Sequence, residues 1–149
     1  CVGSDVIVGF PGETEAHFLE TYQFINEQPV AYLHVFTYSE RENTLAKDLE
    51  GVIPMVERTA RNQQLRNLSE KKRRAFYESH LNEIRPVLFE DGGTNGFLTG
   101  FTDNYIKVIT PYDPLYPNEI IPMQLTDINA EGMAMGLQSA FCETEPAVI

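Results

Sequence analysis

The stretch DVIVGFPGET, residues 5–14, decides the fold predicted for the first half of the chain. Residues 5–10 are mostly apolar and β-branched and alternate little, which is typical of a buried parallel strand. Pro11 and Gly12 end this strand with a turn. Thr14 is suited to cap a following helix, with acidic residues near the positive helix end. The stretch therefore predicts a strand that runs through a tight turn directly into a helix.

The residues that follow complete a repeating unit. The helix is expected to reach about Asn26 before Pro29 stops it, and residues 31–38 have the pattern of a second strand. Strand, helix and strand at this spacing predict a βαβ unit of an α/β sheet or barrel. Because two strands cannot close such a sheet, we interpret the chain as a fragment of a longer protein. The open edge that remains also predicts self-association.

A polar loop and a long helix are predicted next. Residues 41–54 are mostly polar, and residues 55–81 carry apolar side chains at helical spacing. Between Arg58 and Arg85, eight basic residues stand against three acidic ones, and we expect the basic cluster on the exposed face of this helix. The eight are Arg58, Arg61, Arg66, Lys71, Lys72, Arg73, Arg74 and Arg85.

The pattern changes after Arg85. Five short apolar runs are divided by Gly, Asn, Asp and Pro turns, which predicts a small antiparallel β-barrel of the oligonucleotide-binding kind. The runs read PVLFE, GFLTGFT, NYIKVIT, EIIPMQLTDI and GMAMGLQ. We place the domain boundary near Ile84, so that residues 1–84 form the α/β part, residues 85–138 the barrel and residues 139–149 a tail.

The composition limits the class of protein. The chain has 149 residues, 42% of them hydrophobic, which is enough for a folded core. No run approaches the roughly eighteen apolar residues of a membrane span, and no signal peptide is evident, so we expect a cytoplasmic location and no membrane. Cys1 and Cys142 have neither disulfide-framework nor zinc-site spacing. The three histidines share no metal-ligand spacing either, and the sequence predicts no metal site.

Four stretches, in order, resemble one family. DVIVGFPGET followed by LHVFTYSERENTLA resembles the C-terminal half of the radical SAM core of the methylthiotransferases. LSEKKRRAFY, followed by PVLFE and GFLTGFTDNYIKV, resembles the helix and the TRAM domain that come next in that family. The resemblance extends to about Gln138. It implies an α/β fragment, the last βα units of a radical SAM barrel, followed by an OB-like TRAM barrel.

The resemblance also implies a chemistry. Members of this family use S-adenosyl-L-methionine and [4Fe-4S] clusters to replace an unreactive C–H hydrogen with a methylthio group. They hold the radical cluster with three cysteines in CxxxCxxC and a second cluster with three more. Neither set occurs in this sequence. We therefore expect these cofactors to belong to the parent protein, and expect the fragment alone to bind no cluster and to be inactive.

The cofactor side of the site is predicted at the ends of the two strands. Glycines there would let the backbone approach a ligand, while apolar side chains would form a wall for adenine, as the resemblance implies. The second strand would present its backbone groups to the adenine edge, and the arginine of the Tyr-Ser-x-Arg motif would pair with an anion. The candidates are Ile7, Gly9, Phe10, Pro11, Gly12, Val35, Phe36, Tyr38 and Arg41.

The loop that carries Arg41 departs from the family pattern. The family has Ser-Pro-Arg-Pro-Gly-Thr, whereas Glu40, Glu42 and Asn43 occupy the Pro and Gly positions here. Asparagine tolerates a positive φ, so the turn is expected to survive in a less rigid form.

Candidate RNA contacts lie on the helix and the barrel. Lys71, Lys72, Arg73 and Arg74 precede the barrel, which offers only Lys107. A run of this kind is by default a solvated helix face, and phosphate contact is the alternative. Phe97, Phe101 and Tyr105 are suited to stack on bases. We expect at least two of these three aromatic residues to lie in the core instead.

Three functions remain open at this point. The first is a tRNA methylthiotransferase acting on the modified adenosine next to the anticodon, with GFTDNYIKV most like the subgroup that modifies threonylcarbamoyladenosine. The second is the sister group that methylthiolates an aspartate of a ribosomal protein, which the acidic barrel and the net charge of −11 favour. The third is a binding module without catalysis, whose partner is RNA or protein. We favour the first, with the anticodon loop of tRNA as partner.

Overall fold

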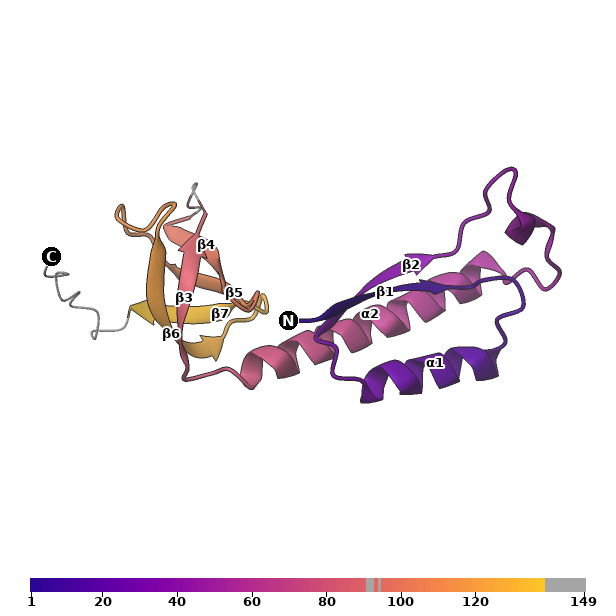
Figure 1. The fold of residues 1–149 in the computed structure, drawn as a ribbon, viewed down its shortest axis with the longest axis horizontal. Coiled ribbons are helices and arrows are strands. Elements are labelled where there is room, and N and C mark those ends of the chain that lie inside the picture. Colours follow the sequence, from indigo (N-terminus) through magenta and orange to yellow (C-terminus); the bar gives the residue numbers. More distant parts are fainter. Residues whose placement is uncertain (91–92, 94, 139–149) are drawn as a thin grey trace, which may run out of the picture. The chain divides into compact units, whose positions relative to one another are not determined.

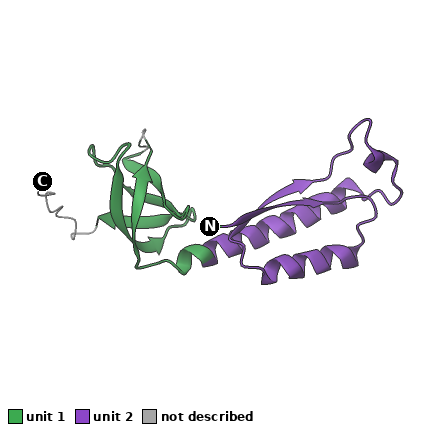
Figure 2. Ribbon diagram, viewed as in Figure 1, with its two compact units in different colours: residues 1, 76–149 green, residues 2–75 purple. Residues whose placement is uncertain are grey.

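A computed structural model describes residues 1–90, 93 and 95–138 of the chain (Figure 1). Two compact units can be distinguished (Figure 2). The N-terminal unit comprises Val2–Ala75, and the barrel unit comprises Phe76–Ile149 together with Cys1. The division falls inside the second helix, eight residues before the first barrel strand begins at Ile84. The tail predicted at residues 139–149 lies outside the described residues.

The N-terminal unit contains the strand, helix and strand that the sequence predicts. Strand β1 (Gly3–Val8) leads into α1 (Glu15–Glu27) and then into β2 (Tyr32–Thr37). The strands pair in parallel, with Gly3 opposite Tyr32 and Val8 opposite Thr37. Figure 1 shows them side by side, with the two long helices running along them.

Local capping explains where α1 begins and ends. Thr14 Oγ1 accepts a hydrogen bond from the His17 backbone N–H at 3.2 Å, and His17 Nδ1 accepts one from the Thr14 backbone N–H at 3.4 Å. This is a capping box in which histidine takes the place usually held by glutamate or glutamine. At the other end, Lys72 Nζ donates to the carbonyl oxygens of Asn26 at 3.0 Å and Gln28 at 2.9 Å.

A short connection and one long helix complete this unit. The 3₁₀ helix η1 (Leu45–Asp48) precedes α2 (Met55–Glu78), as the apolar spacing predicts for α2. One apolar core joins the sheet to both α-helices. Its buried members are Val8, Phe18, Ile25, Leu33, Leu65 and Leu68. Neither α1 nor α2, the α-helices of the described residues, is long and apolar enough to cross a bilayer.

Side chains of α2 also cover the outer edge of β2. Ser69 Oγ accepts from the Leu33 backbone N–H at 2.8 Å and donates to the Leu33 carbonyl oxygen at 3.2 Å. Asn62 Nδ2 donates to the Val35 carbonyl oxygen at 3.2 Å. A covered edge is a poor template for another strand. The edge of β2 is thus unavailable to another strand, and β1 is the strand that would offer its edge. Self-association itself stays a prediction.

The barrel unit is a closed five-stranded barrel. Its strands are β3 (Ile84–Phe89), β4 (Phe97–Thr102), β5 (Lys107–Pro111), β6 (Ile120–Ile128) and β7 (Ala134–Gln138), in the closed order β3–β4–β5–β7–β6. The prediction of five strands and a small barrel is confirmed, but the prediction that all pairings are antiparallel is wrong. Strands β5 and β7 pair in parallel. In a closed ring of five strands the directions cannot alternate all the way round, so at least one pair must be parallel.

The barrel is filled by apolar side chains. Its largest fully buried members include Phe89, Leu98, Ile106 and Met123. Phe89 stacks on Tyr116 with ring centroids 5.6 Å apart. The Tyr116 hydroxyl donates to Gln138 Oε1 at 3.0 Å, and burial, with a smaller effect of Asp113, raises the pKa of Tyr116.

Candidate functional site

Three chain segments come together where β1 and β2 end. The strands are parallel, so their carboxyl ends lie at the same edge of the sheet, where ligands commonly bind in α/β folds. Residues 9–13 follow β1, residues 38–41 follow β2, and the start of α2 contacts both segments. The nine predicted cofactor-side residues therefore lie on β1, β2 and the segments that follow them.

The loop of residues 9–13 contains two glycines in left-handed backbone conformation. Gly9 has φ +80° and Gly12 has φ +85°, a region that favours glycine. The Gly12 N–H donates to the Gly51 carbonyl oxygen at 2.8 Å. A Cβ at Gly12 would meet no atom within 4 Å, so a ligand has room to approach the backbone there.

Gly9 has a different surrounding. A Cβ at Gly9 would overlap the Cγ of Arg58 and lie 2.9 Å from its Cδ. The sequence predicts that both glycines admit a ligand, but the space beside Gly9 is filled by protein. Its lack of a side chain instead lets α2 come close to the loop. Pro11, between the two glycines, is half-buried.

The apolar candidates divide between the two faces of the sheet. Ile7 and Phe36 are register partners on the uncovered face, where they are 60% and 52% exposed. Phe10 is also exposed and contacts Tyr38 edge to face, with ring centroids 5.2 Å apart. Val35 packs against the core on the opposite face, and its carbonyl oxygen already accepts from Asn62. Ile7 and Phe36 thus form an exposed apolar pair to which Val35 contributes no side chain.

Tyr38 ties the end of β2 to its neighbours. Its backbone N–H donates to the Val8 carbonyl oxygen at 2.8 Å, and its carbonyl oxygen accepts from Arg58. Its hydroxyl oxygen is buried without a hydrogen-bond partner in the described part of the chain. Such an orphaned polar group is uncommon in folded proteins.

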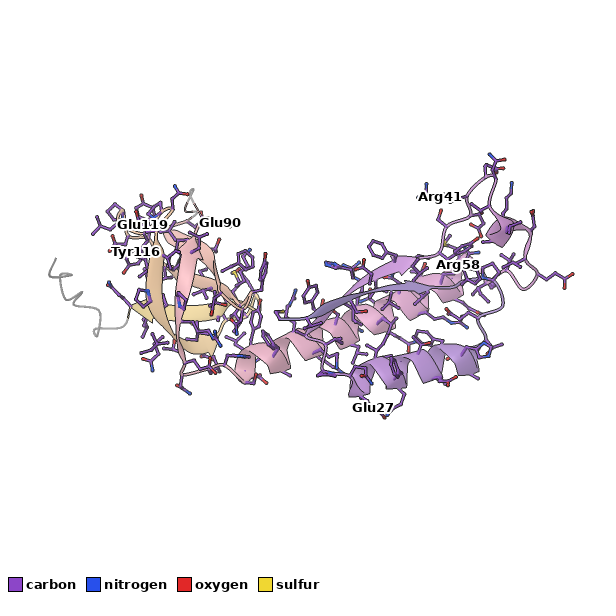
Figure 3. The ribbon with its side chains drawn as sticks, viewed as in Figure 1. Glu27, Arg41, Arg58, Glu90, Tyr116 and Glu119 are labelled. Carbon is purple, nitrogen blue, oxygen red and sulfur yellow. The ribbon has the colours of Figure 1, made fainter. Side chains whose placement is uncertain are left out.

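Arg41 lies on the exposed connection after β2 (Figure 3). Its carbonyl oxygen accepts from Thr44 Oγ1 at 2.8 Å, and within the described residues its guanidinium makes no ion pair. Asn43 has φ +63°, so the turn survives the replacement of glycine, as predicted. The guanidinium of Arg41 is therefore accessible to an anion from outside this segment.

Sequence reasoning placed Arg58 and Arg61 on an exposed helix face, and this was wrong. They are 3% and 4% exposed, three residues apart on α2. Arg58 stands in the first turn of α2, where the helix dipole disfavours positive charge, and Arg61 follows in the second turn. The unfavourable position of Arg58 indicates that it has an acidic partner, but it does not indicate which acidic residue of the loops that partner is.

Arg58 makes hydrogen bonds to two segments at once, residues 38–41 and the approach to α2. Its Nε donates to the Ile53 carbonyl oxygen at 2.7 Å, its Nη1 to the Tyr38 carbonyl oxygen at 2.9 Å, and its Nη2 to Glu40 Oε1 at 2.5 Å. The guanidinium carbon lies 5.4 Å from the centre of the Tyr38 ring. The hydrogen bond from Arg58 holds the pKa of the Glu40 carboxyl below its usual value. Figure 3 labels Arg58 on α2.

Arg61 binds the glycine loop through Glu13. Its Nη1 donates to the Glu13 carbonyl oxygen at 2.9 Å and to Glu13 Oε1 at 2.7 Å. The other carboxylate oxygen of Glu13 accepts from the Gly9 N–H at 3.1 Å. Arg61 also lies 3.4 Å from Glu15 Oε2, and its buried Nε has no partner in the described residues.

The candidate RNA contacts are not equivalent. Lys71 and Arg73 are exposed, whereas the ammonium of Lys72 is occupied at the end of α1. Arg74 is exposed but already has an interaction of its own. Lys107 Nζ lies 5.9 Å from the centre of the Phe101 ring. Lys71 and Arg73 are therefore the best placed of these cations for a phosphate.

The barrel aromatics were also placed wrongly. Phe97 is 45% exposed and Tyr105 is 71% exposed, so two of the three residues lie on the surface, where at most one was expected. Tyr105 sits in a tight turn with φ +66°, which keeps its side chain out of the core. Phe101 is half-buried against Tyr105.

Comparison with known proteins places this segment in a family, although no family model matches the chain. It is 39% identical over 112 residues to threonylcarbamoyladenosine tRNA methylthiotransferase MtaB of Bacillus subtilis, which covers 72% of this chain and 25% of that protein. It is 33% identical over 127 residues to the tRNA-2-methylthio-N(6)-dimethylallyladenosine synthase of Symbiobacterium thermophilum, covering 84% of this chain and 27% of that protein.

A relative with a different named substrate is similar to the same degree. The ribosomal protein uS12 methylthiotransferase RimO of Gloeobacter violaceus is 38% identical over 126 residues, covering 81% of this chain and 29% of that protein. The chain thus spans between a quarter and a third of the length of these three relatives. All three are methylthiotransferases by name or by the product that they make, and the resemblance seen in the motifs is confirmed. The chain belongs to the methylthiotransferase family.

Proposed function

We propose that the chain is part of a radical SAM tRNA methylthiotransferase, which adds a methylthio group to C2 of the modified adenosine next to the anticodon. The observation that carries the proposal is the juxtaposition at the end of β1. Gly12, whose backbone is open to a ligand, lies in the loop that follows β1. Ile7 of β1 and its register partner Phe36 of β2 form an exposed apolar pair. The names of the relatives support tRNA as the substrate.

The residues present fit part of an S-adenosylmethionine site. Exposed apolar side chains suit the adenine ring, and the space above Gly12 suits close approach of a ligand. When bound with a reduced cluster, this cofactor supplies the radical that removes an unreactive hydrogen atom. This segment would bind and orient the cofactor, and Arg41 would pair with an anionic group near it.

The residues present do not fit an iron–sulfur cluster. Within the described residues no three His, Cys, Asp or Glu side chains are grouped for a metal, and Cys1 is a single exposed thiol. Clusters of this kind need several cysteine thiolates. We propose that the clusters are held by residues of the parent protein outside this segment, and that the segment alone is inactive.

A protein substrate is the second candidate. The relative that acts on a ribosomal protein is about as similar as the relatives that act on tRNA. The surface of the barrel is acidic, with Glu90 and Glu119 labelled in Figure 3, and it would attract a basic protein more than RNA. The motif GFTDNYIKV, which is most like the threonylcarbamoyladenosine subgroup, favours tRNA.

The two substrates can be separated with the full-length protein. After anaerobic reaction with unmodified tRNA or with ribosomal protein uS12, mass spectrometry of nucleosides and peptides shows which one gains a methylthio group. We expect the gain on the adenosine next to the anticodon. A gain on a uS12 aspartate alone contradicts the proposal.

Arg41 provides a test within the segment. We expect Arg41→Ala to lower the rate strongly, because the proposal assigns its accessible guanidinium to an anionic group of the ligand. Arg66→Ala is the matched control, since Arg66 is exposed on α2. Equal rates for the two variants would remove Arg41 from the site.

A further inference from the structure

The arginine pair, Arg58 and Arg61, contacts the segments on both sides of the proposed cofactor site. We infer that these two residues position the loop of residues 9–13, and that the loop takes its ligand-ready shape only while both forked side chains are in place. The identity of the ligand, S-adenosylmethionine, rests on the proposed function. The shape of the loop rests on the contacts of the arginine pair alone.

Arg58 determines how closely the loop lies against α2. Its aliphatic part fills the space where a side chain at Gly9 would be. Its guanidinium reaches past Gly9 to the carbonyl oxygens of Tyr38 and Ile53 and to the carboxylate of Glu40. The end of β1, the end of β2 and the approach to α2 are therefore fixed to one side chain.

Arg61 determines how the loop closes on itself. Its Nη1 donates to Glu13 Oε1 at 2.7 Å and to the Glu13 carbonyl oxygen at 2.9 Å. The other carboxylate oxygen, Glu13 Oε2, accepts from the Gly9 N–H at 3.1 Å. The first and last residues of the loop are thus joined through a charged group that α2 supports. Because residues 9 and 13 are fixed, the left-handed backbone at Gly12 is held toward the open side.

The chemistry of these side chains suits positioning better than general stabilisation. A buried guanidinium loses its hydration, and an apolar side chain of similar volume often serves stability equally well. What an apolar side chain cannot supply is several directed donors in one plane. The hydrogen bonds of Arg58 and Arg61 in the described residues all end on atoms of the chain itself, as a positioning role requires.

Lysine variants test this inference on the 149-residue chain. Arg58→Lys and Arg61→Lys keep the charge but replace the planar fork with a single ammonium group. Amide hydrogen exchange, resolved by NMR, reports the loop directly. We expect the Gly9 and Gly12 amides to exchange at least about tenfold faster in both variants, since local opening governs protection. The Phe18 amide, bonded to the carbonyl oxygen of Thr14 at the N-cap of α1, is expected to keep its rate.

Two further variants make the result interpretable. Arg66→Lys, on an exposed position of the same helix, is expected to change neither loop amide. If Arg61→Lys also speeds exchange at Phe18 and so loosens the whole unit, Glu13→Gln is used instead. It removes the charge partner while keeping the shape, and we expect faster exchange at Gly9 with Phe18 unchanged. Loop amides that keep their wild-type rates in these variants overturn the inference.

Affinity for S-adenosylmethionine, measured by equilibrium dialysis with the full-length protein, links the loop to the ligand. We expect Arg61→Lys to weaken binding about tenfold and Arg66→Lys to leave it unchanged. A loosened loop with wild-type affinity overturns the positioning role. If the wild-type protein does not bind S-adenosylmethionine, the proposed function fails, and the exchange rates still decide whether the arginine pair holds the loop.

Discussion

The two units of this chain differ in the kind of polar side chain that they bury. In the described residues, the buried polar side chains of the N-terminal unit are two arginines, whereas those of the barrel unit are Thr102 and Thr110. The barrel closes on itself and can be held by apolar packing and small hydroxyls. The sheet of the N-terminal unit has one uncovered face, and the loops at its end are held by the guanidinium groups of Arg58 and Arg61. A closed unit can rely on its core, while an open unit that holds a ligand loop needs directed contacts.

The largest expected effect lies in the core of the barrel unit. Phe89 is fully buried and stacks on Tyr116. We expect Phe89→Ala to destabilise this unit by about 3–5 kcal/mol, because it removes buried apolar surface and leaves a cavity. Hydrogen exchange resolved by unit measures the loss. Phe97→Ala, at a position 45% exposed, is the control and is expected to cost well under half as much.

Arg61→Met should have a smaller effect, in the N-terminal unit alone. It leaves Glu13 buried to a large degree without its cationic partner, which costs about 3–5 kcal/mol for a fully buried pair. Glu13 remains 17% exposed, so partial hydration lowers the expected loss to about 2 kcal/mol. Urea unfolding followed by unit-resolved exchange measures it. A barrel unit destabilised to the same extent would contradict the separation of the two units.

Lys72 and Lys71 separate structure from RNA contact within one basic run. We expect Lys72→Met to lower the stability of the N-terminal unit by about 0.5–1 kcal/mol, because it removes a cation from the C-terminal end of α1. Lys71→Met should leave stability unchanged and reduce the salt slope of tRNA binding by the full-length protein by about one. Filter binding at two salt concentrations checks the second part, and equal slopes for both variants would contradict it.

The smallest expected effect concerns pH. The hydrogen bond from Arg58 lowers the pKa of Glu40 in the folded chain, so the folded state binds fewer protons there than the unfolded state. The resulting stabilisation is present above the unfolded pKa of about 4.3 and is lost as pH falls through the lower folded value. We expect the Tm difference between wild type and Glu40→Gln to shrink below about pH 4. Glu20→Gln, at an exposed site on α1, should show no such change.

The sequence predicted the elements well because their signals are local. Thr14 and Pro29 mark the ends of α1, and the Gly, Asn and Pro turns separate all five barrel strands. The sequence predicted β1 as a buried strand, but Ile7 and its register partner Phe36 are exposed in the described residues, because the core covers only the other face of the sheet. The contacts of Arg58 and Arg61 were missed because they join segments 18 to 48 residues apart, which no short pattern reports. The parallel β5–β7 pair was missed for the same reason, since it depends on how the barrel closes.

The odd number of barrel strands has a consequence for synthesis of the chain. Strand β7 is the last of the five to leave the ribosome, yet it pairs with both β5 and β6 and so completes the ring. Until residues 134–138 emerge, the sheet has unpaired edges at β5 and β6, which are sites for wrong pairing. In the part of the chain that the structure describes, the seam with β5 consists of two residue pairs, Val108 with Ala134 and Ile109 with Met135. A chain that stopped just before Ala134 would keep the edges of β5 and β6 unpaired.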